Sequence, residues 1–244
     1  MPEVKRKNIY ESLPLIYNHL MRRIKYDYWA DYLFHLTSKY VSTQATVLEL
    51  AGGNCKLAEF MRKKYPHIIV SDLSAEMLAS SEDTTLSKVC CDMLFPPFKK
   101  TFDLIYITFD SINYLLTKKK MLLFFNGIKR LLRDNGIFAF DASLERNSIS
   151  HISQPVRKAR YNGYNYVHKS TYDKGTRIHK NVFNIIFPDG VVYKEVHKQK
   201  ILEYYDYFDL IEKAGLYVVE CFDAFTFNNG KASSKRVQFV VKKA

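Results

Sequence analysis

The chain has 244 residues, 47% of them hydrophobic and 15% aromatic, which is typical of a folded globular domain and excludes a disordered chain. This length suffices for one domain with a buried core, alone or with one added segment. No run of 18 apolar residues occurs, so we expect no membrane-spanning helix. The formal net charge of +12 leaves open an acidic small-molecule partner. It does not favour nucleic acid, because the lysines and arginines are scattered in short groups.

The N-terminus carries basic residues but no long apolar segment and no small-residue cleavage site. We therefore expect no signal peptide and a cytoplasmic location. The cysteines, at positions 55, 90, 91 and 221, form no CxxC pair. Free thiols are expected, with neither a disulfide nor a metal site.

The first 42 residues are predicted to form an N-terminal helical cap of one or two helices. Apolar residues recur at helical spacing from Leu13 to Ile24, and the segment is rich in aromatic residues. Strands then alternate with helices. We predict strands at 46–50, 67–72, LSKVCCD, FDLIYITFD and IFAFDA, with helices at about 55–65, near Ala75 and at 118–133. This order predicts βαβ units in a doubly wound, mostly parallel α/β sheet.

After Ala142 polar and apolar residues alternate, interrupted by the turn sequences DKGT and PDG. We predict a three-stranded antiparallel meander, inserted as residues 146–203 into a core made of residues 43–145 and 204–244. A helix ending at Gly215 and two closing strands, LYVVECFDAF and SKRVQFVVKK, would complete a seven-stranded sheet. The chain is thus predicted to be a single domain over residues 1–244.

The segment VLELAGGNCKLAEF, residues 47–60, joins a predicted strand to a predicted helix through small residues. A dinucleotide-binding fingerprint is excluded, because Ala51 and Lys56 stand where two of its glycines would be. A phosphate-binding loop is excluded too, since no Gly-Lys-Ser/Thr ends the segment. Glu49, at the end of the strand, would repel a pyrophosphate and favour a cofactor that carries an ammonium group.

This segment resembles the first motif of the class I S-adenosylmethionine-dependent methyltransferases, an acidic residue followed by GxGxG. Glu49 matches the acidic residue, and Ala51, Gly52 and Gly53 match the start of the glycine motif. Cys55 departs from the motif at its third glycine, where it brings a side chain to a point of close backbone and cofactor approach.

The resemblance continues in the order of that fold. Asp72 closes the second strand, at the spacing from which an acidic residue reaches ribose hydroxyls. CDMLFPPF is similar to the segment that borders the adenine, and FDLIYITFDSINYL to the fourth-strand motif of a small-molecule branch with the sequence DSxNYL. LLRDNGIFAFD is similar to the entry to the fifth strand, and the last helix and hairpin to those that end the fold.

The resemblance implies S-adenosylmethionine as cofactor, S-adenosylhomocysteine as product, and methyl transfer to an N or O nucleophile of a small molecule. It also implies a set of cofactor-binding residues: Tyr17, Trp29, Glu49, Ala51, Gly52, Gly53, Asp72, Leu73, Met77, Asp92, Met93, Phe109 and Asp110. Structural alternatives stay open for some of them, namely helix capping for Asp72, a turn for Asp92 and Asp110, and helix core for Met77.

Methyl transfer from a sulfonium requires mainly orientation and desolvation from the protein. We expect Tyr114 to face the substrate and His197, on the last meander strand, to act as a base where one is needed. The aromatic residues Tyr17, Tyr28 and Trp29 would cover the sulfonium as part of a lid, or else simply pack on the sheet.

Two other functions stay open. If the Cys55 side chain fills the cofactor space, the chain would be a catalytically weak cofactor-binding protein that acts through a partner. An RNA methyltransferase is less favoured, because no arginine-rich stripe is present. Both a monomer and a homodimer agree with the sequence.

Overall fold

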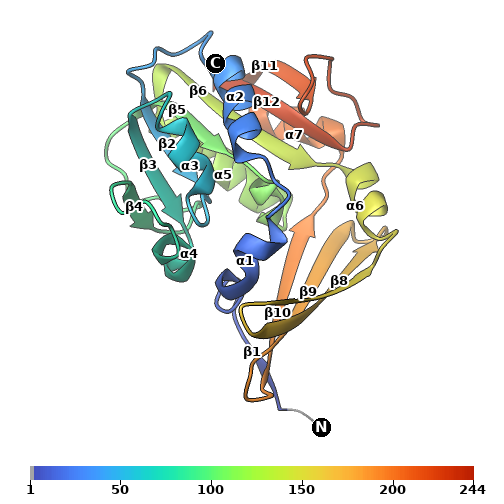
Figure 1. Cartoon of the computed structure of the whole chain (residues 1–244). Coiled ribbons are helices and arrows are strands. Elements are labelled where there is room, and N and C mark those ends of the chain that lie inside the picture. The colour runs from blue at the N-terminus through green and yellow to red at the C-terminus, as the bar shows by residue number, and fades with distance from the viewer. Residues whose placement is uncertain (1–2) are drawn as a thin grey trace.

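The computed structural model describes residues 3–244, which form two sheets with helices packed around them (Figure 1). The larger sheet has seven strands in the order β11-β12-β6-β5-β2-β3-β4. Its strands are β2 (Thr46–Leu50), β3 (His67–Asp72), β4 (Ser87–Cys90), β5 (Phe102–Ile107), β6 (Leu132–Ser143), β11 (Leu216–Asp223) and β12 (Arg236–Lys243). Strands β2 to β6 pair in parallel, whereas β12 is antiparallel to both β6 and β11. The α/β sheet predicted from the sequence is therefore present, as a mixed and mostly parallel sheet.

Helices cover both faces of this sheet, which is why its central strands are apolar on both sides. The helices of the chain are α1 (Pro14–Leu20), α2 (Tyr26–Thr37), α3 (Lys56–Met61), α4 (Ala75–Ala79), α5 (Lys118–Leu131), α6 (Glu145–His151), α7 (Tyr204–Lys213) and the 3-10 helix η1 (Ser111–Tyr114). On β2, Leu48 packs in the core beneath α5 and α7, and Val47 packs in the core beneath α2 and α3. Gly215 follows α7 with φ +70°, as predicted for a helix end.

The smaller sheet corrects two sequence predictions. It has five strands in the order β1-β10-β9-β8-β7, namely β1 (Val4–Arg6), β10 (Val192–Lys200), β9 (Ile178–Ile186), β8 (Tyr164–Asp173) and β7 (Val156–Tyr161). Residues 146–203 therefore hold four antiparallel strands and most of α6, where three strands were predicted. The missed strand β7 is mostly exposed and lacks apolar alternation, but the Asn162–Gly163 turn that follows it is a hairpin signal.

The N-terminal segment is not purely helical as predicted, since β1 pairs in parallel with β10 before α1 and α2 begin. Residues 1 and 2 of the predicted cap lie outside the described residues. Figure 1 shows α1 at the junction of the two sheets and α2 above it. The helix predicted at 55–65 is shorter, ending at Met61. Within residues 3–244, no helix combines the length and apolarity required to cross a membrane.

Candidate active site

The loop after β2 is a tight turn held in left-handed backbone conformations. Ala51, Gly53 and Cys55 have φ values of 53°, 57° and 63°. The Gly52 amide donates a 2.9 Å hydrogen bond to the carbonyl oxygen of Ser71 on β3. A Cβ on Gly52 would lie 2.3 Å from Val70 Cγ1, so that only glycine fits without movement of the strand beneath.

Asp72 joins this loop to the end of β3. Its Oδ2 accepts a 2.8 Å hydrogen bond from the Gly53 amide, and its Oδ1 accepts one of 2.9 Å from the Ser74 amide. Burial raises the pKa of the Asp72 carboxyl, an effect that these backbone hydrogen bonds oppose. Asp72 is not the N-cap of α4, because Ser74 holds that position and accepts from the Met77 amide. Asp72 instead bonds the amides of Gly53 and Ser74 and lines a cavity.

That cavity, of about 130 Å³, lies over the loop. Predicted cofactor residues supply much of its wall, namely Tyr17, Ala51, Gly52, Gly53, Asp72, Leu73, Met77, Asp92, Met93 and Phe109. The cavity is also lined by four residues that were not among the predicted ones, namely Tyr10, Tyr26, Asn54 and Ser111. The density of aromatic residues before residue 40 was the available signal for the two tyrosines.

Three predicted cofactor residues lie elsewhere. Trp29 and Asp110 line a second cavity, and Glu49 lies beneath the loop instead of on the cavity wall. The Glu49 carboxyl carbon is 3.1 Å from the position of a Cβ on Gly52, and Glu49 Oε2 has no hydrogen-bond partner among residues 3–244. Burial raises the pKa of Glu49 to about 8. The buried Glu49 oxygen fits a cofactor that carries a positive charge, because such a group would compensate the carboxylate. The absence of room for a Cβ at Gly52 fits a cofactor that lies close to the loop backbone.

Cys55 does not occupy the cavity. Its side chain is fully buried in the core that includes Leu57 and Ala58, and it is absent from the walls of both cavities. Burial also raises the pKa of the Cys55 thiol to about 12, which leaves it unreactive. The departure from the glycine motif is thus accommodated in the helix packing.

The second cavity, of about 490 Å³, adjoins the first through a shared wall formed by Tyr10, Tyr17, Phe109 and Tyr114. The smaller sheet and α6 contribute mostly polar side chains to it, including His151, Arg157, His168, His179, His197 and Gln199. The inserted strands therefore form one side of this cavity, and the seven-stranded sheet forms the other.

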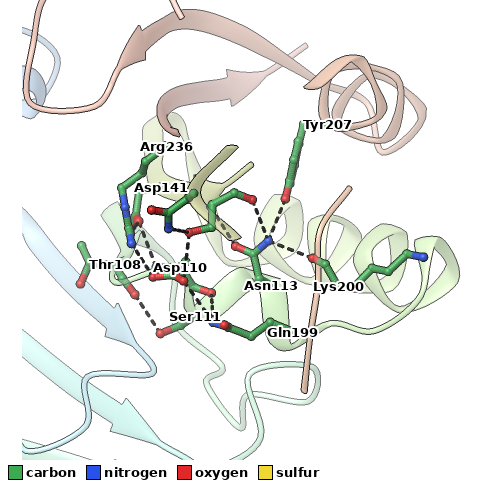
Figure 2. A network of polar contacts seen from close by, with 11 residues as sticks. Thr108, Asp110, Ser111, Asn113, Asp141, Gln199, Lys200, Tyr207 and Arg236 are labelled. Atoms are coloured by element: carbon green, nitrogen blue, oxygen red, sulfur yellow. Dashed lines mark hydrogen bonds and ion pairs between the residues drawn. The ribbon is translucent and has the colours of Figure 1, made fainter. Parts of the chain in front are cut away.

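Asp110 belongs to a polar network that links the two sheets (Figure 2). Its Oδ1 accepts a 2.7 Å hydrogen bond from Arg236, and its Oδ2 accepts bonds from Ser143 Oγ at 3.1 Å and Gln199 Nε2 at 3.2 Å. Arg236 also pairs with Asp141, whose pKa burial raises to about 6. The network holds Phe109 and Asp110 in left-handed conformations, with φ 57° and 51°, that cost energy in residues other than glycine.

Asn113, on η1, bonds to backbone groups that are distant in the sequence. Its Nδ2 donates to the carbonyl oxygens of Ser143, at 3.2 Å, and Lys200, at 2.9 Å. Its Oδ1 accepts a 3.0 Å bond from the Ser143 amide. Asn113 thereby fixes η1, and with it Tyr114, against β6 and the end of β10.

Tyr114 and His197, the two predicted catalytic residues, are brought together. The Tyr114 hydroxyl lies 3.0 Å from His197 Nδ1 and 2.9 Å from the Tyr10 hydroxyl. Burial raises the pKa of Tyr114 well above its usual value, so its hydroxyl stays protonated at neutral pH. His197 Nε2 lies 3.1 Å from Glu195 Oε2. Among residues 3–244 no cluster of three or more metal-ligating side chains occurs.

Comparisons with known proteins agree with this geometry. Residues 47–136 match a family described as a methyltransferase domain. A proposed methyltransferase of Geobacillus sp. (strain WCH70) is 28% identical over 96% of this chain and 99% of its own length. YqeM, a proposed methyltransferase of Bacillus subtilis (strain 168), is 24% identical over 97% and 98%.

Solved structures share the fold at low identity. An S-adenosylmethionine-dependent methyltransferase from Clostridium acetobutylicum superposes with a TM-score of 0.77, at 21% identity over 96% of this chain and 99% of its own. The sugar N-methyltransferase KedS8 from Streptoalloteichus sp. gives 0.72, at 15% identity over 93% and 91%. CalS10 of Micromonospora echinaspora, an amino pentose methyltransferase bound to S-adenosylmethionine, gives 0.70, at 15% identity over 93% and 95%. The family match and the two relatives indicate a methyltransferase, and solved structures of S-adenosylmethionine-dependent methyltransferases share its fold.

Proposed function

We propose that this chain methylates an N or O nucleophile of a small molecule. The observation that carries the proposal is the pair of adjoining cavities, one over the β2 loop and a larger one beside it, with Tyr10, Tyr17, Phe109 and Tyr114 between them. A cofactor in the first cavity and a small acceptor in the second would meet at this aromatic wall, away from water.

The residues of the first cavity suit the parts of S-adenosylmethionine, the proposed cofactor. The Ala51–Gly53 backbone would hold its amino acid portion, Asp72 its ribose hydroxyls, and Asp92 with Met93 its adenine. The ionised form of Glu49, beneath the loop, would be stabilised by the cofactor ammonium group. The cofactor supplies an activated methyl group on a sulfonium. Aromatic faces at the shared wall would attract that cation and exclude water from it.

Tyr114 and His197 would handle the proton that the acceptor loses. The Tyr114 oxygen can take the proton of an N–H or O–H group while its own hydroxyl proton passes to His197 Nδ1, 3.0 Å away. The N-terminal segment with α1 would act as the lid, since Tyr10 and Tyr17 lie on the walls of both cavities.

The acceptor is proposed to be polar. The second cavity is lined by histidine, asparagine and glutamine side chains, and Arg157 would bind an acidic group on the acceptor. The segment Asp110–Leu115, similar to the DSxNYL sequence of the small-molecule branch, supports this choice. KedS8 and CalS10, which share the fold, are named as methyltransferases of a sugar nitrogen and of an amino pentose.

Calorimetric titration with S-adenosylhomocysteine tests the cofactor site, and a screen of small amines, amino sugars and hydroxy acids for S-adenosylhomocysteine release tests the reaction. Asp72→Ala should weaken binding at least about tenfold, because it removes a hydrogen-bonding carboxylate. Asp209→Ala is the matched control, since Asp209 lies exposed on α7, far along the chain from the loop. Equal affinity in the two variants would argue against the assigned site.

A further inference from the structure

Glu195 is a fully buried carboxylate in the smaller sheet, and the reaction proposed above does not account for it. It lies on β10, two residues before His197, with no exposed surface. Its Oε1 accepts hydrogen bonds from the amides of Ser12 and Leu13, the latter at 2.9 Å. Its Oε2 accepts a 2.8 Å bond from the Tyr10 amide and faces His197 Nε2 at 3.1 Å.

These partners keep the carboxylate ionised. Burial works against the charged form, but the hydrogen bonds from His197, Ser12 and Leu13 outweigh it and lower the pKa of Glu195. A buried charge is tolerated only where donors satisfy it, and here all of the donors come from two places. Three belong to the N-terminal segment and one belongs to the imidazole of His197.

The three backbone donors fix the segment that covers the cavities. Ser12 and Leu13 directly precede α1, which carries Tyr17. Tyr10 is held at both ends, because its amide bonds to Glu195 while its hydroxyl lies 2.9 Å from that of Tyr114. Its φ of 60° is unfavourable for a tyrosine and shows that these contacts determine its conformation.

The fourth contact fixes the tautomer of His197. A carboxylate can only accept, so Nε2 must carry the proton that points at Glu195. In the neutral ring Nδ1 is then the acceptor and faces the Tyr114 hydroxyl. With the opposite tautomer Nδ1 would be a donor, and the proton of Tyr114 would have no acceptor on His197.

We propose that Glu195 is a positioning residue that couples docking of the N-terminal segment, residues 10–13, to the tautomer of His197. The Tyr114–His197 pair is then ready to accept a proton only when the segment covers the cavities. When the segment leaves, Glu195 loses three donors and Tyr114 loses its contact with Tyr10. This inference rests on the proposed roles of Tyr114 and His197.

The first test needs no variant. Long-range proton–nitrogen correlation spectra of the wild-type protein with S-adenosylhomocysteine, recorded at about pH 8 where a histidine is usually neutral, report the tautomer of His197. We expect a single form with the proton on Nε2. A ring protonated on Nδ1 would overturn the proposal.

The second test uses Glu195→Gln, with hydrogen exchange measured at the amides of Tyr10, Ser12 and Leu13. The neutral amide offers one acceptor oxygen in place of two, so we expect exchange to be about tenfold faster or more and the His197 ring to populate both tautomers. Glu220→Gln is the control, because Glu220 lies on β11 and pairs with Lys39, and neither readout should change. If only one of the two readouts changes in Glu195→Gln, the coupling is wrong.

Failure of this inference and failure of the proposed function can be told apart. If the His197 tautomer and the amide exchange behave as expected but no small acceptor is methylated, the role of Glu195 stands and the proposed reaction is wrong. If a small acceptor is methylated but Glu195→Gln changes neither the amide exchange nor the His197 tautomer, the proposed reaction stands and the role of Glu195 is wrong.

Discussion

The two sides of the candidate active site, one at each cavity, differ in what determines their structure. The proposed cofactor side depends on the backbone conformation of one loop, with Ala51, Gly53 and Cys55 in left-handed conformations around Gly52. The proposed acceptor side has many polar side chains from the smaller sheet, several of them buried, such as His179 and His197. The first side tolerates few residue types at each position, and the second depends on contacts between residues far apart in sequence.

Replacement of Arg236 should cause the largest loss of stability on the side of the second cavity. Arg236→Met would leave the buried Asp141 and the half-buried Asp110 without their shared cation, which should cost about 3–5 kcal/mol of unfolding free energy. Chemical denaturation measures this loss. Arg133→Met removes a half-exposed pair with Asp103 and should cost less than about 1 kcal/mol.

The folded fraction of Arg236→Met should keep its affinity for S-adenosylhomocysteine, since Arg236 lines the second cavity and not the first. Loss of cofactor affinity in proportion to the loss of stability would show that the two sides are not separable.

Glu49 should make the stability of the cofactor-free protein depend on pH. Its pKa rises from 4.5 to about 8 on burial, so between these values the unfolded chain binds fewer protons than the folded one. Stability contributed by this group is complete below about pH 4.5 and is lost as the pH rises towards 8. Glu49→Gln should remove the slope, leaving the variant more stable at pH 8 by on the order of 4 kcal/mol.

Denaturation of wild type and Glu49→Gln across this pH range measures the effect, with Asp209→Asn as a surface control. Cofactor binding should release protons in the same range, because an ammonium group favours ionised Glu49. The released protons appear as a dependence of the calorimetric heat on the buffer. Equal slopes in the two proteins would contradict the assignment.

Gly52 tests the backbone side directly. In Gly52→Ala the new Cβ would overlap Val70 Cγ1 at 2.3 Å, so we expect a loss of about 1–3 kcal/mol and much weaker cofactor binding. Gly127→Ala is matched, because Gly127 lies inside α5 with no atom within 4 Å of an added Cβ. That variant should gain about 0.5–1 kcal/mol. Thermal unfolding and titration with S-adenosylhomocysteine distinguish the two.

The sequence predicted the side of the first cavity better than the side of the second, because the first depends on local patterns and the second on contacts between distant residues. The loop, Asp72 and the parallel strands are local patterns, and the structure has a tight turn, a cavity-lining carboxylate and the expected sheet there. Glu195 was not identified, because the three backbone amides that it accepts from lie more than 180 positions away and a strand glutamate carries no local signal. Asp110 was assigned to the cofactor, but its partner Arg236 is 126 positions away.

Substitution of Cys55 should have the smallest effect on stability, and it tests directly whether this side chain lies outside the cofactor cavity. Its φ of 63° favours glycine, so Cys55→Gly would relieve local strain, while the loss of a buried side chain and a more flexible unfolded chain would oppose that gain. We expect the unfolding free energy to change by less than about 1 kcal/mol. Because the thiol points into the core, affinity for S-adenosylhomocysteine should change by less than about threefold, well under 1.4 kcal/mol. A gain of about tenfold or more in calorimetric titration would mean that the side chain intrudes on the cofactor and that this position is not a matter of backbone alone.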